Sequence, residues 1–306
     1  MKRDFTRLLD VTGEECAYLL ERALFLKQAR RTHGEYKPLK GLTLGMIFEK
    51  ASTRTRISFE VGMEELGGRA IFLSPTETQM GRGEPVRDTA RVLSRYVHAI
   101  MIRTFSQGTV EELAHWSSVP VINGLSDLYH PCQTLADLFT VREYKQRLDG
   151  LKIAYVGDGN NIANSWIEAA LLLGFSLAVA TPQKYAPLPD LVEKGREKGV
   201  LTLCTDPVGA AEGADVISTD VWVSMGEEGE KERRLRAFRG YQINAKILGA
   251  AKKDVSVMHC LPAHRGLEIS EDVIEGPRSI VWRQGENKLY GAAAVLEWLV
   301  GTDARS

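Results

Sequence analysis

A run of hydroxyl and guanidinium side chains, Ser-Thr-Arg-Thr-Arg at residues 52–56, lies between a predicted strand at 42–48 and a predicted helix at 57–66. At a helix N-terminus, free backbone N–H groups and the helix dipole favour an anion, and a guanidinium binds phosphate oxygens in pairs. The alternative is that Ser52 or Thr53 only caps the helix while the arginines are solvated. Because three hydroxyls alternate with two arginines, we favour a phosphate site.

A second polar group follows the predicted strand at 119–123, where Tyr-His-Pro-Cys-Gln-Thr at 129–134 reads as a strand-to-helix turn. Arg103 follows another predicted strand, 98–102. Polar side chains at the carboxyl ends of parallel strands belong to the ligand crevice of an open α/β sheet. The imidazole of His130 and the guanidinium of Arg103 are therefore candidates for ligand binding, although a backbone carbonyl in the turn could equally satisfy His130.

A glycine-containing loop at 157–163 follows the predicted strand 151–156 and suggests a dinucleotide site. The fingerprint fails, because Ile162 occupies the position of the third glycine and the next strand ends at 180–182 without an acidic residue for a ribose. A dehydrogenase is thus a minor alternative. The two asparagines of the loop suit a zwitterionic, amino-acid-like ligand better.

Two further loops follow predicted strands. Residues 220–228 are rich in small, acidic and glycine residues and could form a mobile lid, or only an acidic surface loop. In the second loop, 259–264, His259 and Cys260 are adjacent, so their side chains should point to opposite faces and should not form a nucleophilic dyad.

Cysteine and histidine spacing does not predict a metal centre. A zinc site could be built from His130, Cys132, Cys260 and His264. The two pairs, however, lie in different predicted domains and lack zinc-finger spacing. The four cysteines form no Cys-x-x-Cys pair, which fits reduced thiols. No metal is expected.

Alternating apolar and helical segments predict an α/β fold with two domains, each a mostly parallel sheet covered by helices on both faces. A length of 306 residues is about twice a typical ~150-residue domain. We place the domains at 1–149 and 150–284, with a final helix at about 285–301 packing back on the first. The predicted strands are 42–48, 98–102, 119–123, 151–156, 176–180, 215–219 and 255–259.

Net charge and hydropathy argue against two classes of partner, nucleic acids and membranes. The net charge of −1 leaves no positive excess for nucleic acid, and no segment approaches the ~18 apolar residues of a membrane span. The first residues show no secretory or mitochondrial targeting pattern, so we expect a cytoplasmic protein without membrane or nucleic-acid partners.

Four motifs, taken in order, resemble the aspartate/ornithine carbamoyltransferases over nearly the whole chain. These are Ser-Thr-Arg-Thr-Arg at 52–56, His-Pro-Cys-Gln at 130–133, Asp-Val-Trp-Val-Ser-Met-Gly at 220–226 and His-Cys-Leu-Pro at 259–262. The first two are shared with the aspartate enzymes, whereas Ser-Met-Gly and His-Cys-Leu-Pro point to the ornithine enzymes.

The resemblance implies a carbamoyl phosphate domain at 1–149 and an ornithine domain at 150–284. It assigns catalysis to Arg103, His130 and Cys260. It assigns carbamoyl phosphate binding to Ser52, Thr53, Arg54, Thr55, Gln79, Arg103, His130, Gln133, Cys260, Leu261 and Lys288. It assigns ornithine binding to Asn161, Asp220, Ser224 and Met225, with Asp220 on the α-ammonium group.

The resemblance also implies carbamoyl transfer from carbamoyl phosphate to the δ-amine of L-ornithine, giving L-citrulline and phosphate. It implies no cofactor, and a homotrimer with active sites at subunit interfaces, where Gln79 reaches the phosphate of a neighbouring subunit. The chain departs from the family at Lys288, where an arginine is usual, and either Lys288 or Arg283 could replace it. The alternatives are a related acceptor such as putrescine, or a non-catalytic two-domain protein that binds a phosphorylated metabolite.

Overall fold

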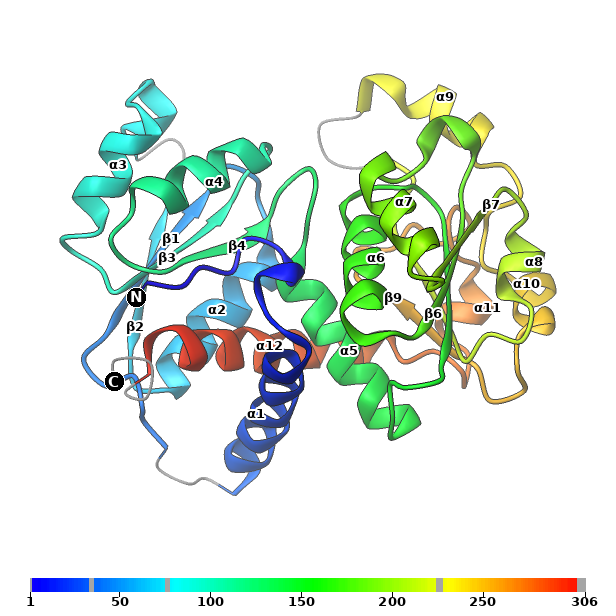
Figure 1. Cartoon of the computed structure of the whole chain (residues 1–306), viewed down its shortest axis with the longest axis horizontal. Helices are drawn as coiled ribbons and strands as arrows, with labels where there is room; N and C mark the ends of the chain where they lie inside the picture. Colours follow the sequence, from blue (N-terminus) through cyan, green and yellow to red (C-terminus); the bar gives the residue numbers. More distant parts are fainter. Residues whose placement is uncertain (1, 33–35, 75–77, 224–227, 302–306) are drawn as a thin grey trace. The chain divides into compact units, whose positions relative to one another are not determined.

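The computed structural model describes residues 2–32, 36–74, 78–223 and 228–301. The chain forms two compact units, one made of residues 1–139 with 286–306 and the other of residues 140–285. Each unit contains one parallel β-sheet with helices on both faces (Figure 1). The predicted α/β class is therefore confirmed.

The first unit contains a four-stranded sheet in the order β2-β1-β3-β4. Helices α3 and α4 cover one face over an apolar cluster that includes Ile100 and Val110, and α1, α2 and α12 lie on the other side (Figure 1). The strands are β1 (Thr43–Phe48), β2 (Arg69–Leu73), β3 (Ala99–Arg103) and β4 (Val121–Leu125). The helices are α1 (Gly13–Arg31), α2 (Thr53–Glu65), α3 (Val86–Leu93), α4 (Gln107–Trp116), the first part of α5 (Pro131–Lys145) and most of α12 (Val281–Val300), and the short 3₁₀ helices are η1 (Leu8–Asp10) and η2 (Met80–Arg82).

The second unit contains a five-stranded sheet in the order β7-β6-β5-β8-β9. The strands are β5 (Lys152–Val156), β6 (Ser176–Ala180), β7 (Leu201–Cys204), β8 (Val216–Thr219) and β9 (Ser256–His259). The helices are α6 (Asn161–Leu173), α7 (Pro189–Glu197), α8 (Pro207–Ala211), α9 (Lys231–Ala237), α10 (Ala245–Ala250) and α11 (Glu271–Ile274), with 3₁₀ helices η3 (Gln183–Tyr185) and η4 (Glu228–Glu230).

Each sheet has a point where the strand order reverses. In the first unit the chain passes from β1 to β2 and then returns to β3 on the other side of β1. In the second it passes from β5 through β6 to β7 and returns to β8 on the other side of β5. At such a point the loops from two neighbouring strands part, which leaves a crevice at the carboxyl ends of the strands. The candidate residues follow these strands.

Several predicted boundaries were wrong. Strands β2 and β7 were not predicted at all. The strand placed at 119–123 lies two residues later, at Val121–Leu125. The sequence predicts a helix that runs to residue 148, whereas α5 ends at Lys145, and Gln146 directly after it has a φ of 58°. The final helix begins at Val281 rather than at about 285, so Arg283 lies in its first turn.

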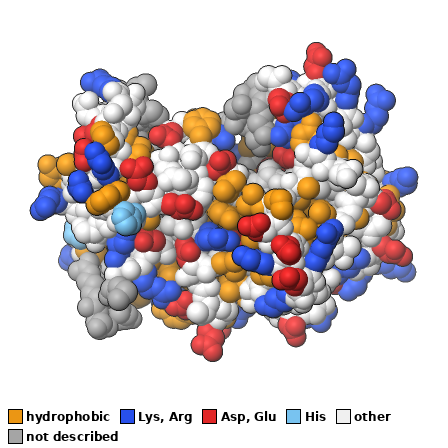
Figure 2. Space-filling model, turned by 45° about the horizontal axis from the view of Figure 1, so that its top comes forward, with side chains coloured by type: hydrophobic (Ala, Val, Ile, Leu, Met, Phe, Trp, Pro, Cys, Tyr) orange, Lys and Arg blue, Asp and Glu red, His pale blue; other side chains and the backbone are white. Residues whose placement is uncertain are grey.

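The surface is mixed in charge. On the face drawn in Figure 2, Lys and Arg side chains are interspersed with Asp and Glu side chains, in keeping with the net charge of −1. Among the described residues, we find no helix with the length and apolar character needed to cross a membrane.

Candidate active site

The N-terminus of α2 forms the floor of the candidate phosphate site. Ser52 is the N-cap residue, and its side chain accepts a hydrogen bond from the backbone N–H of Thr55 at 3.3 Å. Thr53 is exposed, Arg54 is half-buried and Thr55 is fully buried. The capping role that the sequence left open is therefore real. It also points the Ser52 hydroxyl to the end of the helix that favours an anion.

Arg103 adds a buried positive charge beside this helix terminus. It is the last residue of β3, the strand that pairs with β1, and only 6% of it is exposed. Its Nη1 lies 3.5 Å from the Thr55 hydroxyl oxygen, toward which it donates. The structure thus brings the first two predicted groups together across the point of strand reversal.

His130 and Gln133 come from the turn that starts α5, and both are buried. Lys288 of α12, 5% exposed, donates from its Nζ to Gln133 Oε1 at 2.9 Å. The Gln133 amide is oriented in turn, since its Nε2 donates to Asp137 Oδ1 at 2.8 Å. Lys288, one of the two candidates for the missing family arginine, thus contacts another predicted site residue.

Electrostatics explains the protonation state of His130. Burial, followed by the nearby positive charges of Lys288 and Arg103, holds the pKa of the imidazole well below its usual value. At neutral pH the ring is uncharged, so one nitrogen is able to donate a hydrogen bond and the other to accept one. Two cations, hydroxyl groups and a neutral imidazole suit a phosphate with an attached carbonyl group.

Asp220 is the centre of the candidate site in the second unit. It follows β8 and is 8% exposed. Its Oδ2 accepts from Asn160 Nδ2 at 2.8 Å, and its Oδ1 accepts from the Cys260 thiol at 3.0 Å. Asn160 and Cys260 follow β5 and β9. Loops from three strands therefore meet at one carboxylate, which suits an ammonium group.

Asn160 was not on the list of expected site residues. Its Oδ1 caps α6 by accepting from the backbone N–H groups of Ile162 and Ala163, and it also accepts from the Tyr155 hydroxyl at 3.3 Å. Burial and the negative charges nearby, Asp220 first, raise the pKa of Tyr155 well above its usual value, so the hydroxyl stays protonated. The Asn-Asn pair was the only sequence signal for this arrangement.

Arg234 also escaped the sequence analysis. Its Nη1 donates to Asp158 at 2.9 Å and to the carbonyl oxygen of Trp222 at 3.2 Å, and its guanidinium lies over the Tyr185 ring. Asp158 belongs to the loop after β5 and Trp222 to the loop after β8. Arg234 thus ties together the two loops that carry Asn160 and Asp220.

The remaining predicted residues differ in how much the structure says of them. Asn161 is the first residue of α6 and is half-buried, and Leu261 directly follows Cys260. Gln79 is exposed just before η2, and its reach to a neighbouring subunit stays a prediction. Ser224 and Met225 lie outside the described residues.

His259 and Cys260 do not pair with each other. His259 Nδ1 accepts from the backbone N–H of Leu261 at 2.9 Å, and its Nε2 lies 3.0 Å from Glu268 Oε1, while the Cys260 thiol donates to Asp220. Within the described ranges, Asp220, His259 and Cys260 are the one group whose ligand atoms are close enough to hold a metal ion. Each of them already makes a hydrogen bond within the protein.

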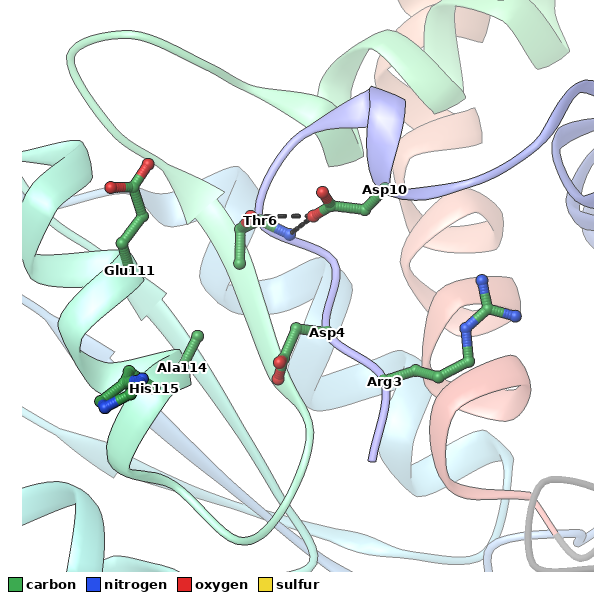
Figure 3. A pocket seen from close by; sticks show the side chains of 7 residues that line it. All are labelled: Arg3, Asp4, Thr6, Asp10, Glu111, Ala114 and His115. Carbon is green, nitrogen blue, oxygen red and sulfur yellow. Dashed lines mark hydrogen bonds between the residues drawn. The ribbon is translucent and has the colours of Figure 1, made fainter. Parts of the chain in front are cut away.

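A hollow of about 430 Å³ lies elsewhere on the first unit (Figure 3). It is lined by Arg3, Asp4, Thr6, Asp10, Glu111, Ala114 and His115. The Asp10 carboxylate accepts from the Thr6 backbone and hydroxyl at 2.6 and 2.8 Å, and Asp4 accepts from the Val121 N–H at 2.8 Å. These carboxylates serve the local fold, and none of the predicted site residues lines the hollow.

The chain was compared with known proteins. Residues 3–143 match the family described as aspartate/ornithine carbamoyltransferase, carbamoyl-P binding domain, and residues 149–299 match its Asp/Orn binding domain. Ornithine carbamoyltransferase of Methanoculleus marisnigri is 52% identical over 301 residues, which cover 98% of this chain and 97% of that protein. The anabolic ornithine carbamoyltransferase of Pseudomonas aeruginosa is 52% identical over 298 residues, covering 97% of each.

Solved structures give the same result. Ornithine carbamoyltransferase from Pyrococcus furiosus superposes with a TM-score of 0.94 at 49% identity, covering 98% of this chain and 97% of that one. The anabolic enzyme from Campylobacter jejuni has a TM-score of 0.92 at 42% identity over the full length of both chains. The expected family is confirmed: the chain belongs to the aspartate/ornithine carbamoyltransferases.

Proposed function

We propose that this protein transfers the carbamoyl group of carbamoyl phosphate to the δ-amine of L-ornithine, giving L-citrulline and phosphate. The observation that carries the proposal is the pairing, within one chain, of a cationic crevice in the first unit with an Asp220-centred site in the second. Relatives about half identical over their whole length are ornithine carbamoyltransferases. We assign carbamoyl phosphate to residues 1–149 with the final helix, and ornithine to residues 150–284.

In this assignment the phosphate lies at the N-terminus of α2, held by the Ser52, Thr53 and Thr55 hydroxyls, backbone N–H groups and Arg54. The carbamoyl end faces Arg103, His130, Gln133 and Lys288. As the neutral δ-amine attacks the carbamoyl carbon, negative charge develops on the carbonyl oxygen. Arg103 and the neutral imidazole of His130 stabilise that charge by donating hydrogen bonds, and Thr55 supports them.

Phosphate is the leaving group and takes the proton lost by the attacking amine, so no protein group has to change its net protonation. Asp220 holds the α-ammonium group of ornithine, and Asn161, Ser224 and Met225 complete that site. Cys260 and Leu261 contact both substrates near the amine. Since the Cys260 thiol donates to Asp220, we assign it an orienting role rather than nucleophilic attack.

The test is citrulline formation by the purified protein, with ornithine, putrescine, N-acetylornithine and aspartate compared as acceptors. We expect ornithine to have by far the highest kcat/KM. Faster turnover of putrescine would favour the related-acceptor alternative. Binding of carbamoyl phosphate without turnover of any amine would favour a non-catalytic binding protein.

We also propose a homotrimer that works in the cytoplasm. β2 is an edge strand, and Ile71 on it and Ile57 on the neighbouring α2 are 43% and 51% exposed. An apolar sheet edge of this kind favours association with another chain. Sedimentation should give a trimer, and Ile57→Asp should shift it toward smaller species.

None of the four cysteines is in a disulfide, which fits a reducing compartment such as the proposed cytoplasm.

A further inference from the structure

Lys27 is a buried charge that the proposed reaction leaves unused. It lies on α1, only 2% of it is exposed, and lysine is almost never found at this depth without a specific partner. Its Nζ donates to Asn287 Oδ1 at 2.7 Å. It also lies 5.4 Å from the ring centre of Phe139 and 5.6 Å from that of Tyr290. Its surroundings thus come from α5 and α12.

These same two helices carry the carbamoyl end of the proposed site. Asn287, fully buried, directly precedes Lys288 in α12, and Lys288 donates to Gln133 of α5. Figure 1 shows α1 and α12 side by side, and the Arg22–Glu297 ion pair confirms that they are in contact. Lys27 therefore holds the residue next to Lys288 from the side of α1.

We propose that Lys27 is a positioning residue for the carbamoyl phosphate site, fixing the turn of α12 from which Lys288 reaches Gln133. The inference rests on the proposed role of Lys288. Lysine has a flexible four-carbon stem and acts as a point charge, whereas an arginine carries a rigid planar fork. A lysine at this position therefore loses more conformational freedom per hydrogen bond than an arginine would, and a fixed backbone limits that loss. A buried ammonium bonded to the neighbouring side chain fixes the backbone in this way.

The test compares two variants that each remove polar contact between α1 and α12, at Lys27 the hydrogen bond to Asn287 and at Arg22 two hydrogen bonds to Glu297. Lys27→Met removes the contact beside Lys288, and Arg22→Met removes the ion pair with Glu297, whose Nε–Oε2 distance is 2.8 Å. We expect Lys27→Met to raise the KM for carbamoyl phosphate by about fivefold to tenfold, about 1–1.4 kcal/mol. The KM for ornithine should stay unchanged. Arg22→Met should lower the melting temperature and leave both KM values unchanged.

A double-mutant cycle shows whether Lys27 acts through Lys288. If it does, Lys27→Met has little further effect on carbamoyl phosphate in a Lys288→Met background, because coupled residues are not additive. Full additivity, or equal KM values for Lys27→Met and Arg22→Met, would overturn the proposal. Lys27→Gln replaces Lys27→Met in the same cycle if the latter does not fold.

The proteins of this cycle are also compared without an activity assay, by measuring how far carbamoyl phosphate raises the melting temperature of each. This rise should shrink in Lys27→Met and persist in Arg22→Met. A wild-type protein that makes no citrulline would contradict the proposed function, while this binding readout would still decide the role of Lys27.

Discussion

His130 is buried, with 4% of it exposed, and lies near two positive charges. Both effects favour the neutral imidazole, and burial is the larger. A charged imidazolium near Lys288 and Arg103 would add a third cation, whereas the neutral ring can donate a directed hydrogen bond to the carbonyl oxygen of the proposed substrate. Arg103 and Lys288 thus supply the positive charge of the candidate site, and the neutral imidazole of His130 can supply a hydrogen bond in a fixed direction.

This environment predicts a pH-dependent stability. The unfolded histidine takes up a proton below a pKa of about 6.5, while the folded one stays neutral, so the unfolded state binds more protons and stability falls as the pH drops below that value. The limiting slope for one proton is about 1.4 kcal/mol per pH unit. In His130→Gln this contribution is absent. The stability advantage of wild type over the variant should therefore shrink between pH 6.5 and 5, measured by denaturant unfolding.

The control for this measurement is His115→Gln, since His115 is exposed. The stability of this variant is measured over the same pH range, so that the effect of losing an exposed histidine can be compared with that of losing His130. If the stability of His130→Gln changed with pH in the same way as that of wild type, the lowered pKa of His130 in the folded protein would be contradicted.

At the residue scale, the sequence predicts the candidate ligand-binding side chains better than the residues that position those side chains. Arg103 and His130 follow predicted strands that are parallel neighbours in the sheet, so both lie at the same edge of it. The sequence marked Asn160 only as one of two asparagines in a loop, and it did not mark Arg234. Their roles depend on partners 60 and 76 positions away in the chain, and no local pattern encodes such pairs.

At the scale of elements, strands buried along nearly their whole length were predictable, including the edge strands β4 and β9, whereas the two partly exposed edge strands were not. β1 is buried along its whole length, and its continuous apolar run is typical of a central parallel strand. β2 and β7 lie at sheet edges, and both are partly exposed. β7 is also only four residues long. Exposure weakens the apolar pattern, and a strand this short carries too few residues to show it.

Gly159, in the loop between β5 and α6, has no room for a larger side chain. A Cβ on Gly159 would lie 2.3 Å from the carbonyl oxygen of Tyr185 and 2.4 Å from the nitrogen of Pro187, so Gly159→Ala must move the loop. Asn160, which holds Asp220, is the next residue. We expect a loss of about 1–3 kcal/mol of stability. The KM for ornithine should rise in steady-state assays, while that for carbamoyl phosphate stays unchanged.

Gly249→Ala is the matched control, because an added Cβ at this position in α10 meets no atom within 4 Å. Replacing a helical glycine by alanine should be neutral or stabilising by up to about 1 kcal/mol. An unchanged ornithine KM in a folded Gly159→Ala protein would show that the loop does not position Asp220.

At the scale of the whole molecule, the alternation of strands and helices predicted two parallel sheets, and the order of four motifs predicted the family. Both inferences used patterns that recur along the chain. Each unit has its own point of strand reversal, and each has one group of site residues beside it. This arrangement favours one substrate per unit, and it makes the two binding functions separable by mutation.

Asp220→Asn tests that separation. The carboxylate accepts from Asn160 and Cys260, and an amide in its place loses the negative charge and turns an NH₂ group toward one of these donors. Losing a charge-assisted contact of about 1.5–3 kcal/mol should raise the KM for ornithine roughly tenfold to 150-fold. The rise in melting temperature caused by carbamoyl phosphate should match that of wild type, whereas Arg103→Met should abolish it. Loss of the carbamoyl phosphate effect in Asp220→Asn would mean that the two sites depend on each other, because a defect confined to the second unit would then reach a ligand assigned to the first.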